Sequence, residues 1–428
     1  MKAIASSLAS IVGEENAVSL WENIELSQQK LIQQAMASAT PPSCIVYPRT
    51  QEQLATVIAE CYQNNWRVLP CGSGSKLTWG GLAKSVDVVV STERINQLIE
   101  HAVGDLTVTV EAGMKFSSLQ AILAKSRQFL ALDPTTPELA TIGGIVATGD
   151  TGSLRQRYNS VRDQLLGITF VRADGQIAKA GGRVVKNVAG YDLMKLFTGS
   201  YGTLGVISQV TFRVYPVQEA SGTVVLTGTA EAISQAAATL RGSALTPTQA
   251  DLLSTKLVSS LGLGEGLGLI GRFQSISESV KEQSNRLLEV GQKLGLDGAI
   301  YIDGDEADLW QRLQKSMHCP ATESAISCKI GVLPTAAVEI LTQVELGLIH
   351  IASGLGLLQL EDKNQVLKVR DRLQANSGFL TILEASVKVK QEIDVWGYTG
   401  NALPLMRGIK EQFDSKNILS PGRFVGGI

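Results

Sequence analysis

Glycine is concentrated in two stretches of the chain, and this distribution limits the possible folds more than any other feature of the sequence. Residues 141–207 contain 12 glycines, and Gly72, Gly74, Gly80 and Gly81 form a second group. Over the whole chain, 42 of 428 residues are glycine, compared with a typical share of about 7%. Neither stretch has low complexity, because strand-like runs and specific polar residues alternate with the glycines. The pattern therefore predicts backbone that closely approaches a bound group, not a flexible linker.

Charge and apolar content narrow the class of protein. The 38 basic and 40 acidic residues leave a net charge of −2, which argues against a nucleic-acid or anionic-membrane partner. The composition of 44% hydrophobic and 18% charged residues is typical of a globular chain. A length of 428 residues exceeds what one hydrophobic core usually supports, so we expect two or more domains.

Export, membrane insertion and metal binding are not indicated by the sequence. Residues 1–13 lack the strong apolar run of a signal peptide, and the apolar stretch 346–360 is too short to cross a bilayer. The five cysteines have no paired spacing, which is typical of reduced thiols inside the cell. We therefore expect a cytoplasmic protein with no transmembrane segment and no bound metal.

The pattern of predicted elements changes near residue 217. Before it, short strands such as 67–70 and 106–111 alternate with helices, and a long strand at 206–215 ends at Pro216. After it, strands and helices follow one another at regular intervals. The sequence therefore predicts an α+β protein with a domain boundary at about Val217.

The first candidate binding motif is a strand that runs into a Gly-Ser loop, Pro70-Cys71-Gly72-Ser73-Gly74-Ser75-Lys76-Leu77. Consecutive backbone N–H groups in such a loop can point inward and bind the oxygens of a pyrophosphate. Side chains at positions 72 and 74 would obstruct this approach, and the two serines can add hydroxyl donors. An ordinary turn after a strand is the alternative interpretation.

Two further motifs are rich in small residues. The segment from Pro134 to Gly152 includes Thr135, Thr136, Thr141, Ile142, Gly143, Gly144, Ala147 and Thr148. Its small residues predict a flat wall that can lie against a planar ring system, although close packing of a helix on a sheet needs the same residues. The third motif joins Gly190-Tyr191-Asp192 to a loop containing Gly202 that enters the strand at Val206 and Ile207.

In this order and spacing, the motifs resemble the FAD-binding domain of the vanillyl-alcohol oxidase and p-cresol methylhydroxylase flavoproteins, over residues 41–217. The string Val185-Lys186-Asn187-Val188-Ala189-Gly190-Tyr191-Asp192, with Arg162-Asp163 and the ending Ser420-Pro421-Gly422-Arg423-Phe424, is similar to the FAD-binding E subunits of glycolate oxidase (glycolate dehydrogenase). This resemblance implies an N-terminal helical segment (1–40), an FAD-binding domain (41–217), a cap or substrate domain with an antiparallel sheet (218–398) and a C-terminal segment (399–428) that returns to the FAD-binding domain.

The resemblance also implies how the cofactor is held. The expected FAD contacts are Pro70, Cys71, Gly72, Ser73, Gly74, Ser75, Lys76, Leu77, Pro134, Thr135, Thr136, Thr141, Ile142, Gly143, Gly144, Ala147, Thr148, Gly152, Gly202, Val206 and Ile207. Several relatives bond FAD covalently through a histidine in the Gly-Ser loop, which has none here, so we expect non-covalent FAD. Other departures are Tyr201, where many relatives have glutamate, and Ser415 and Ser420 in the terminal motif.

The residues that would act on substrate are less well indicated. The D-type subunits of these complexes hold a metal through closely spaced histidines, whereas the three histidines of this chain are far apart in sequence. Weak candidates are Lys329 and Arg407 as cations for a carboxylate and His350 as a base. Alternatively, Lys329 lies on an edge strand with its amine in solvent, and His350 is a hydrogen-bonded, semi-buried histidine.

One motif matches a dinucleotide-binding pattern but lacks the structural context that such a site needs. Gly266-Leu267-Gly268-Leu269-Ile270-Gly271 fits the dinucleotide-binding pattern, but that fingerprint needs a strand before it and a helix that opens within it. Here the motif itself reads as the strand, so we do not expect a nicotinamide cofactor at this place.

The sequence thus predicts the FAD-binding subunit of a glycolate (2-hydroxy acid) dehydrogenase. We expect it to pass electrons to an iron–sulfur subunit beside a catalytic D-type flavoprotein subunit, with any position at the membrane coming through these partners. Two alternatives stay open: a stand-alone FAD-dependent D-2-hydroxy-acid dehydrogenase, and a non-catalytic assembly subunit that keeps the FAD fold.

Overall fold

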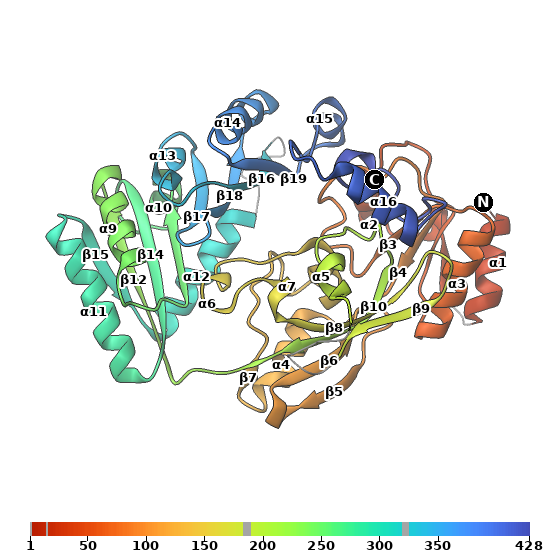
Figure 1. Cartoon of the computed structure of the whole chain (residues 1–428), viewed down its shortest axis with the longest axis horizontal. Helices are drawn as coiled ribbons and strands as arrows, with labels where there is room; N and C mark the ends of the chain where they lie inside the picture. The colour runs from red at the N-terminus through yellow and green to blue at the C-terminus, as the bar shows by residue number, and fades with distance from the viewer. Residues whose placement is uncertain (1, 14–15, 183–189, 319–324) are drawn as a thin grey trace. The chain divides into compact units, whose positions relative to one another are not determined.

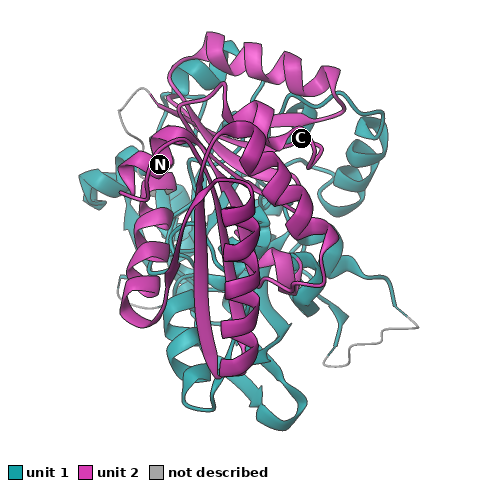
Figure 2. Cartoon of the chain, turned by 90° about the vertical axis from the view of Figure 1, so that its left-hand side faces the viewer, with its two compact units in different colours: residues 1–151, 160–216, 387–428 teal, residues 152–159, 217–386 magenta. Residues whose placement is uncertain are grey.

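The computed structural model describes residues 2–13, 16–182, 190–318 and 325–428, and the chain forms two compact units (Figure 1, Figure 2). Unit 1 is made of Met1–Thr151, Ser160–Pro216 and Val387–Ile428, and unit 2 of Gly152–Asn159 and Val217–Ser386. Helices and mainly antiparallel sheets occur in both, which confirms the predicted α+β class. Compared with the predicted domain ranges, unit 1 also takes in residues 387–398, and unit 2 takes in residues 152–159.

The first part of unit 1 is a four-stranded sheet of order β1-β2-β4-β3, in which β2, β4 and β3 run parallel. Parallel strands are usually covered on both faces, and the valines of β4 show this: Val88 and Val90 join the core with α1 and α3, and Val89 joins the core with α2. Thr50 starts α3 by accepting a hydrogen bond from the Gln53 N–H. The elements are β1 (Val18–Leu20), β2 (Cys44–Val46), β3 (Val68–Cys71), β4 (Val88–Ser91), α1 (Lys2–Val12), α2 (Leu26–Gln34) and α3 (Gln51–Gln63).

The second part of unit 1 is a five-stranded antiparallel sheet of order β5-β6-β10-β8-β9. Its core face packs against helices that carry Leu119, Ile145 and Phe197, with Phe170 and Phe212 from the sheet. The elements are β5 (Leu98–Ala102), β6 (Thr107–Glu111), β8 (Leu165–Val171), β9 (Ile177–Gly181), β10 (Val206–Arg213), α4 (Phe116–Ala124), α5 (Ile142–Thr148), α7 (Val161–Gln164) and α8 (Leu193–Phe197). A separate pair of short antiparallel strands is formed by β7 (Gln128–Phe129) and β11 (Tyr215–Pro216).

The C-terminal part of the chain, with α15 (Val387–Glu392) and α16 (Leu403–Phe413), belongs to unit 1. The backbone of Val68 in β3 donates to the Ile418 carbonyl at 2.8 Å and accepts from the Ser420 N–H at 2.9 Å. Residues 418–420 therefore lie directly beside the strand that leads into the Gly-Ser loop.

Unit 2 is built on an eight-stranded antiparallel sheet of order β15-β12-β14-β13-β17-β18-β16-β19. On one face a Cβ at Gly271 would meet Leu240 of α9 and Leu287 of α11, and Figure 1 shows these two helices along the sheet. The other face shares a core with α10 and α12. The strands are β12 (Ala220–Gly228), β13 (Gln249–Leu253), β14 (Leu267–Ser275), β15 (Asp297–Tyr301), β16 (Ile326–Gly331), β17 (Leu346–His350), β18 (Leu355–Leu360) and β19 (Phe379–Glu384). The helices are α6 (Arg155–Tyr158), α9 (Ala230–Gly242), α10 (Thr255–Ser260), α11 (Ser277–Lys293), α12 (Asp303–His318), α13 (Ala337–Leu341) and α14 (Lys363–Ala375).

Two sequence interpretations are decided by this sheet. Residues 267–271 of the dinucleotide-like motif form the first part of strand β14 (Leu267–Ser275), as predicted from the sequence. The edge-strand interpretation of Lys329 is wrong, because β16 pairs with β18 on one side and with β19 on the other. Its neighbours in the sheet come from distant parts of the sequence, so the position of the strand could not be read locally.

Candidate functional site

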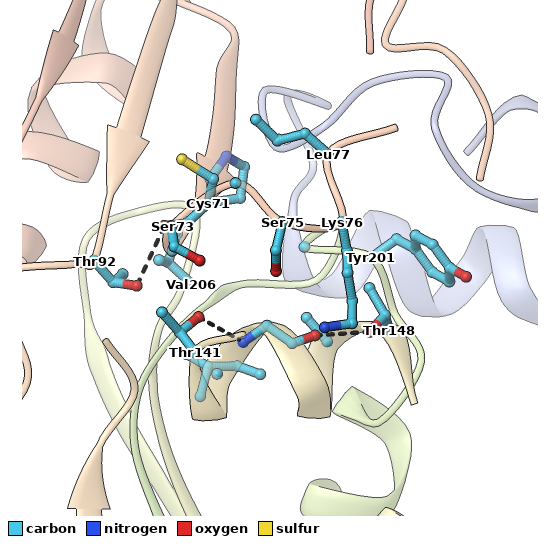
Figure 3. A pocket seen from close by; sticks show the side chains of 18 of the residues that line it. Cys71, Ser73, Ser75, Lys76, Leu77, Thr92, Thr141, Thr148, Tyr201 and Val206 are labelled. Atoms are coloured by element: carbon cyan, nitrogen blue, oxygen red, sulfur yellow. Dashed lines mark hydrogen bonds between the residues drawn. The ribbon is translucent and has the colours of Figure 1, made fainter. Parts of the chain in front are cut away.

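A pocket in unit 1 lies between the Gly-Ser loop after β3 and helix α5 (Figure 3). Figure 3 shows the side chains of Ser73, Ser75 and Lys76 extending from the loop toward α5. The space between the walls is about 680 Å³, including its opening to solvent. The lining residues are Pro70, Cys71, Gly72, Ser73, Gly74, Ser75, Lys76, Leu77, Thr92, Thr141, Gly143, Gly144, Ala147, Thr148, Tyr201, Gly202, Gly205, Val206, Ile207 and Arg423.

The loop presents a run of backbone donors to this pocket. Within the part of the chain that the structure describes, the N–H groups of residues 72–76 have no hydrogen-bond acceptor. The loop is nevertheless fixed: the Leu77 N–H donates to the Gly74 carbonyl at 3.0 Å, and the Ser73 hydroxyl donates to the Leu139 carbonyl. Successive N–H groups held in this way form a concave site for anionic oxygens.

Close packing explains why glycine is needed on both sides of the pocket. A Cβ at Gly72 would lie 2.1 Å from Oγ1 of Thr141, the residue that caps α5 by accepting from the Gly144 N–H. Gly202 has φ of +72°, and a Cβ there would lie 2.8 Å from Cγ of Pro70. At both positions the backbone packs so closely against a neighbouring residue that no side chain larger than a hydrogen fits.

A buried ion pair stands at the α5 end of the pocket. Nζ of Lys76 lies 3.1 Å from Oδ2 of Asp150, and the side chains are 5% and 6% exposed. The same carboxylate accepts from the N–H and the hydroxyl of Thr135, each at 2.9 Å. The ammonium of Lys76 does not meet hydrogen-bond geometry with any partner among the described residues, so its hydrogen-bonding capacity is open to a ligand.

A second cation comes from the end of the chain. Arg423 is 4% exposed, and its Nη2 donates to the carbonyls of Leu77 at 2.5 Å and Trp79 at 3.0 Å. Burial lowers the pKa of Arg423 to about 10, which keeps the guanidinium charged at neutral pH. With Lys76 and Asp150, the charged groups at the pocket sum to about +1, which favours an anionic ligand.

Comparison with known proteins gives the ligand. A profile of the FAD binding domain matches residues 42–181, the segment that supplies the Gly-Ser loop and α5. The structure of p-cresol methylhydroxylase superposes with a TM-score of 0.74 over 99% of this chain and 96% of that protein, at 15% sequence identity. Residues 42–181 thus match an FAD binding domain, and the chain has the fold of p-cresol methylhydroxylase. The predicted cofactor, FAD, is thereby confirmed.

Other similar proteins share this fold or this sequence. 4-Ethylphenol oxidase from Gulosibacter chungangensis has a TM-score of 0.75 at 13% identity, covering 99% of this chain and 96% of the oxidase. A probable mitochondrial D-lactate dehydrogenase of Danio rerio is 26% identical, over 98% of this chain and 91% of its own length. Glycolate oxidase subunit GlcD of Bacillus subtilis is 30% identical over 43% of this chain, and the chain spans only 39% of that relative.

The FAD-binding domain brings most of the predicted contacts to one place. All predicted residues from the Gly-Ser loop and from 202–207 line the pocket, as do Thr141, Gly143, Gly144, Ala147 and Thr148. The remaining predicted contacts are not among the lining residues: Pro134, Thr135, Thr136, Ile142 and Gly152. Ile142 is a buried core residue, and Gly152 groups with unit 2. Direct contacts of individual residues with FAD stay predictions.

Sequence reasoning missed four lining residues of the pocket: Thr92, Tyr201, Gly205 and Arg423. Gly205 and Tyr201 stand inside or next to a motif already singled out, so their neighbourhood was the available signal. Arg423 belongs to the terminal motif, but only tertiary packing places a side chain so far along the chain beside residues 76–79. Residues 185–189 of the most specific string lie outside the described residues.

Cys71 lines the pocket, and a cysteine thiolate can form a covalent thioether with a flavin. Burial raises the pKa of its thiol to about 12, so the thiolate, which is the nucleophile, is scarce at neutral pH. Burial likewise raises the pKa of the Tyr201 hydroxyl, whose ring packs edge-on against Trp396 with centroids 5.0 Å apart. Both groups are therefore neutral in the pocket.

The weak catalytic candidates lie in different surroundings. His350 in unit 2 is 7% exposed, and its Nδ1 lies 2.6 Å from Oδ1 of Asp251 on the neighbouring strand β13. The hydroxyl of Ser153 donates to Oδ2 of the same carboxylate. Lys329 is half-buried in the interior strand β16, and Arg407 is exposed on α16, where it donates to the Gly426 carbonyl at 3.2 Å.

No helix among the described residues is both long enough and apolar enough to span a bilayer.

Proposed function

We propose that this chain is the FAD-binding subunit of a 2-hydroxy-acid dehydrogenase, with glycolate as the substrate and an E-type role in a larger complex. The observation that carries the FAD part is the row of five N–H groups at residues 72–76 that have no acceptor among the described residues, which fits a pyrophosphate. The substrate class is supported by relatives named glycolate oxidase subunit GlcD, D-lactate dehydrogenase and D-2-hydroxyglutarate dehydrogenase.

Each part of the pocket has a distinct task in holding FAD. The N–H groups of residues 72–76 would bind the pyrophosphate oxygens, and Lys76 would neutralise part of their charge. The small residues Gly143, Gly144 and Ala147 on α5 leave a wall without bulky side chains, against which a planar ring can lie. When bound, FAD supplies the acceptor for the hydride that leaves the hydroxyl-bearing carbon.

Oxidation of a 2-hydroxy acid to a 2-oxo acid also needs a base for the hydroxyl proton. His350 is the proposed base. When Nδ1–H donates a hydrogen bond to Asp251, Nε2 carries the lone pair and can accept a proton, as in other Asp–His pairs. Replacing His350 by glutamine should lower the rate of flavin reduction about 100-fold or more without loss of bound FAD, the scale expected for general-base catalysis. Unchanged reduction would exclude His350 as the base.

Electrons would leave the chain through an iron–sulfur partner beside a D-type flavoprotein subunit. The four cysteines in the described residues, Cys44, Cys61, Cys71 and Cys328, are free, and three of them are buried. Because iron–sulfur clusters are held by several cysteine thiolates, the proposal assigns the cluster to a partner. Copurification of a tagged chain from its host, with iron analysis of the complex, tests this part.

The central experiment is an anaerobic titration of the isolated, FAD-loaded chain with glycolate and D-lactate, followed by flavin absorbance near 450 nm. Bleaching by glycolate supports oxidation at this subunit's own flavin. No bleaching by either acid, together with full activity of a complex built with FAD-free protein, would instead identify an assembly subunit. A purified chain that releases no flavin and cannot be reconstituted with FAD would contradict the proposal altogether.

A stand-alone D-lactate dehydrogenase is the second candidate. It is favoured by the match to the Danio rerio protein, which extends over 91% of that relative. Steady turnover by the isolated chain with an artificial dye acceptor distinguishes the two: a stand-alone enzyme turns over D-lactate without partners, whereas a complex subunit needs them.

A further inference from the structure

The C-terminal segment, residues 414–428, supplies one residue to the FAD pocket that no motif of the FAD-binding domain includes. Arg423 lies far beyond the matched range 42–181, yet it lines the pocket. Its Nη1 is buried and has no hydrogen-bond partner among the described residues. Buried donors in native proteins almost always have partners, so this nitrogen indicates a ligand acceptor inside the pocket.

The geometry of the guanidinium fixes where that donor points. Nη2 donates to the carbonyls of Leu77 and Trp79 at 2.5 and 3.0 Å. Because the group is planar and rigid, these bonds also set the direction of Nη1. They hold the charge at the end of the same loop whose N–H groups 72–76 have no acceptor in the described residues.

The backbone around Arg423 is bonded to both sides of the loop. The Arg423 carbonyl accepts from the Gly81 N–H at 3.0 Å, and the Pro421 carbonyl accepts from the Lys84 N–H at 2.8 Å. On the other side, the Ser420 N–H donates to Val68 at 2.9 Å, in the strand that enters the loop. A Cβ at Gly81 would lie 2.8 Å from the Arg423 carbonyl oxygen, so this approach is close.

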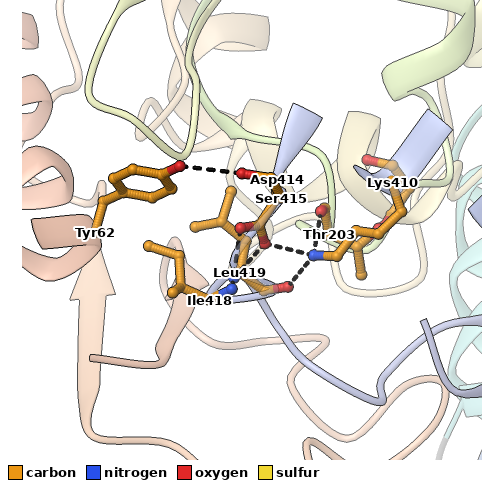
Figure 4. A network of polar contacts seen from close by, with 8 residues as sticks. Tyr62, Thr203, Lys410, Asp414, Ser415, Ile418 and Leu419 are labelled. Carbon is orange, nitrogen blue, oxygen red and sulfur yellow. Dashed lines mark hydrogen bonds and ion pairs between the residues drawn. The ribbon is translucent and has the colours of Figure 1, made fainter. Parts of the chain in front are cut away.

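The network in Figure 4 holds the start of the segment. Asp414, which is 2% exposed, accepts from the N–H groups of Ile418 and Leu419 at 3.0 and 2.7 Å. It also accepts from Nζ of Lys410 at 2.6 Å. The position of Arg423 therefore depends on a continuous series of bonds from α16 to the pocket.

We propose that Arg423 is a cofactor-binding residue delivered by the C-terminal segment: Nη1 donates to a phosphate oxygen of FAD, so that cofactor binding and docking of residues 414–428 stabilise each other. This inference rests on FAD as the occupant of the pocket. A phosphate oxygen is the expected acceptor because the adjacent N–H groups form an anion site and the pocket charges leave an excess of +1 for a ligand that carries two negative charges. Because coupling between two equilibria is reciprocal, FAD must protect the segment as much as the segment retains FAD.

The test uses the full-length chain, stripped of flavin and titrated with FAD by fluorescence quenching. Arg423→Met should weaken FAD binding roughly 10- to 100-fold, the loss expected for one hydrogen bond to a charged group. ADP, which has the pyrophosphate without the flavin, should lose a similar factor in competition with FAD. Lys416→Met is the matched control: it removes the same charge from the same segment, at an exposed amine bonded to the Tyr62 carbonyl at 2.8 Å, and should bind FAD within about twofold of wild type.

The second readout is hydrogen exchange of residues 414–428 with and without FAD. FAD should slow exchange there in wild type and Lys416→Met, but much less in Arg423→Met. Arg423→Met that binds FAD like wild type, or that loses FAD affinity while keeping ADP affinity, would overturn the phosphate contact. Equal FAD-dependent protection in all three proteins would overturn the coupling. Failure of wild type to bind FAD would reject the proposed cofactor site instead.

Folding of the variant is checked by the thermal midpoint of the flavin-free proteins. If Arg423→Met does not fold, Arg423→Lys replaces it, since lysine keeps the charge but cannot bond Leu77 and a phosphate through one rigid fork. An intermediate loss of FAD and ADP affinity is then expected, and wild-type affinity for both would overturn the proposal.

Discussion

Replacement of Asp414 by alanine should detach the C-terminal segment from the FAD-binding domain. Asp414 is 2% exposed, and its carboxylate accepts three hydrogen bonds, from Lys410, Ile418 and Leu419 (Figure 4). Burial lowers the pKa of Lys410, and its ammonium would lose its counter-ion in the variant. The substitution therefore leaves one charge and two backbone N–H groups without their acceptor.

The magnitude follows from these contacts. Removal of one partner from a buried ion pair costs about 3–5 kcal/mol. Lys410 keeps two carbonyl acceptors, Thr203 at 2.8 Å and Leu419 at 2.9 Å, which favours the lower end. The two released N–H groups add about 1 kcal/mol or more each where they stay buried. We therefore expect a loss of about 5 kcal/mol in the free energy of unfolding of unit 1, or roughly 10–20 °C in its thermal midpoint.

The assay is thermal and urea unfolding of the flavin-free protein, with FAD affinity measured in parallel. Asp414→Asn keeps an acceptor oxygen and should lose less stability than Asp414→Ala. Lys410→Met and the double variant Lys410→Met/Asp414→Asn complete a cycle, which should give a coupling energy above about 1 kcal/mol for residues in direct contact. FAD affinity should be lower in those variants in which residues 414–428 are less firmly docked.

Additive effects in the cycle, or an Asp414→Ala protein that unfolds within about 2 °C of wild type, would refute the reasoning. Either result would mean that the segment is held by its backbone bonds to β3 and not by the ion pair.

Three further predictions concern the pocket. Gly72→Val should abolish FAD binding, because even a Cβ would lie 2.1 Å from Oγ1 of Thr141; absorbance at 450 nm after desalting measures it, and a fully loaded variant would contradict the assigned loop. Lys76→Met should weaken FAD binding about tenfold and should not make FAD binding more sensitive to salt. An unchanged dissociation constant would place the ammonium away from the cofactor. Cys71, with its pKa raised to about 12, should react slowly with iodoacetamide between pH 7 and 9, and acid precipitation should release all flavin into the supernatant; flavin that stays with the pellet would show a covalent bond.

Local features of the sequence allowed the cofactor part of the protein to be predicted. Glycine at positions 72 and 202 reflects backbone requirements that are visible in the residue type itself: a close approach at one and a left-handed conformation at the other. Strand and helix periodicity indicated the α+β class in the same way, because the alternation of apolar residues is a property of neighbouring positions. The resemblance of these motifs, in their order, to those of known flavoproteins then implied FAD.

The tertiary structure decided what depends on contacts between distant segments. It placed Arg423 at the end of the Gly-Ser loop, paired Lys76 with Asp150 and set Asp251 beside His350 in neighbouring strands. It also showed that Lys329 lies in an interior strand, although an edge strand had been expected. None of these follows from local sequence, because long-range packing decides a strand's neighbours and a buried charge's partner. Residues tens to hundreds of positions apart must satisfy one another's charge and hydrogen bonds.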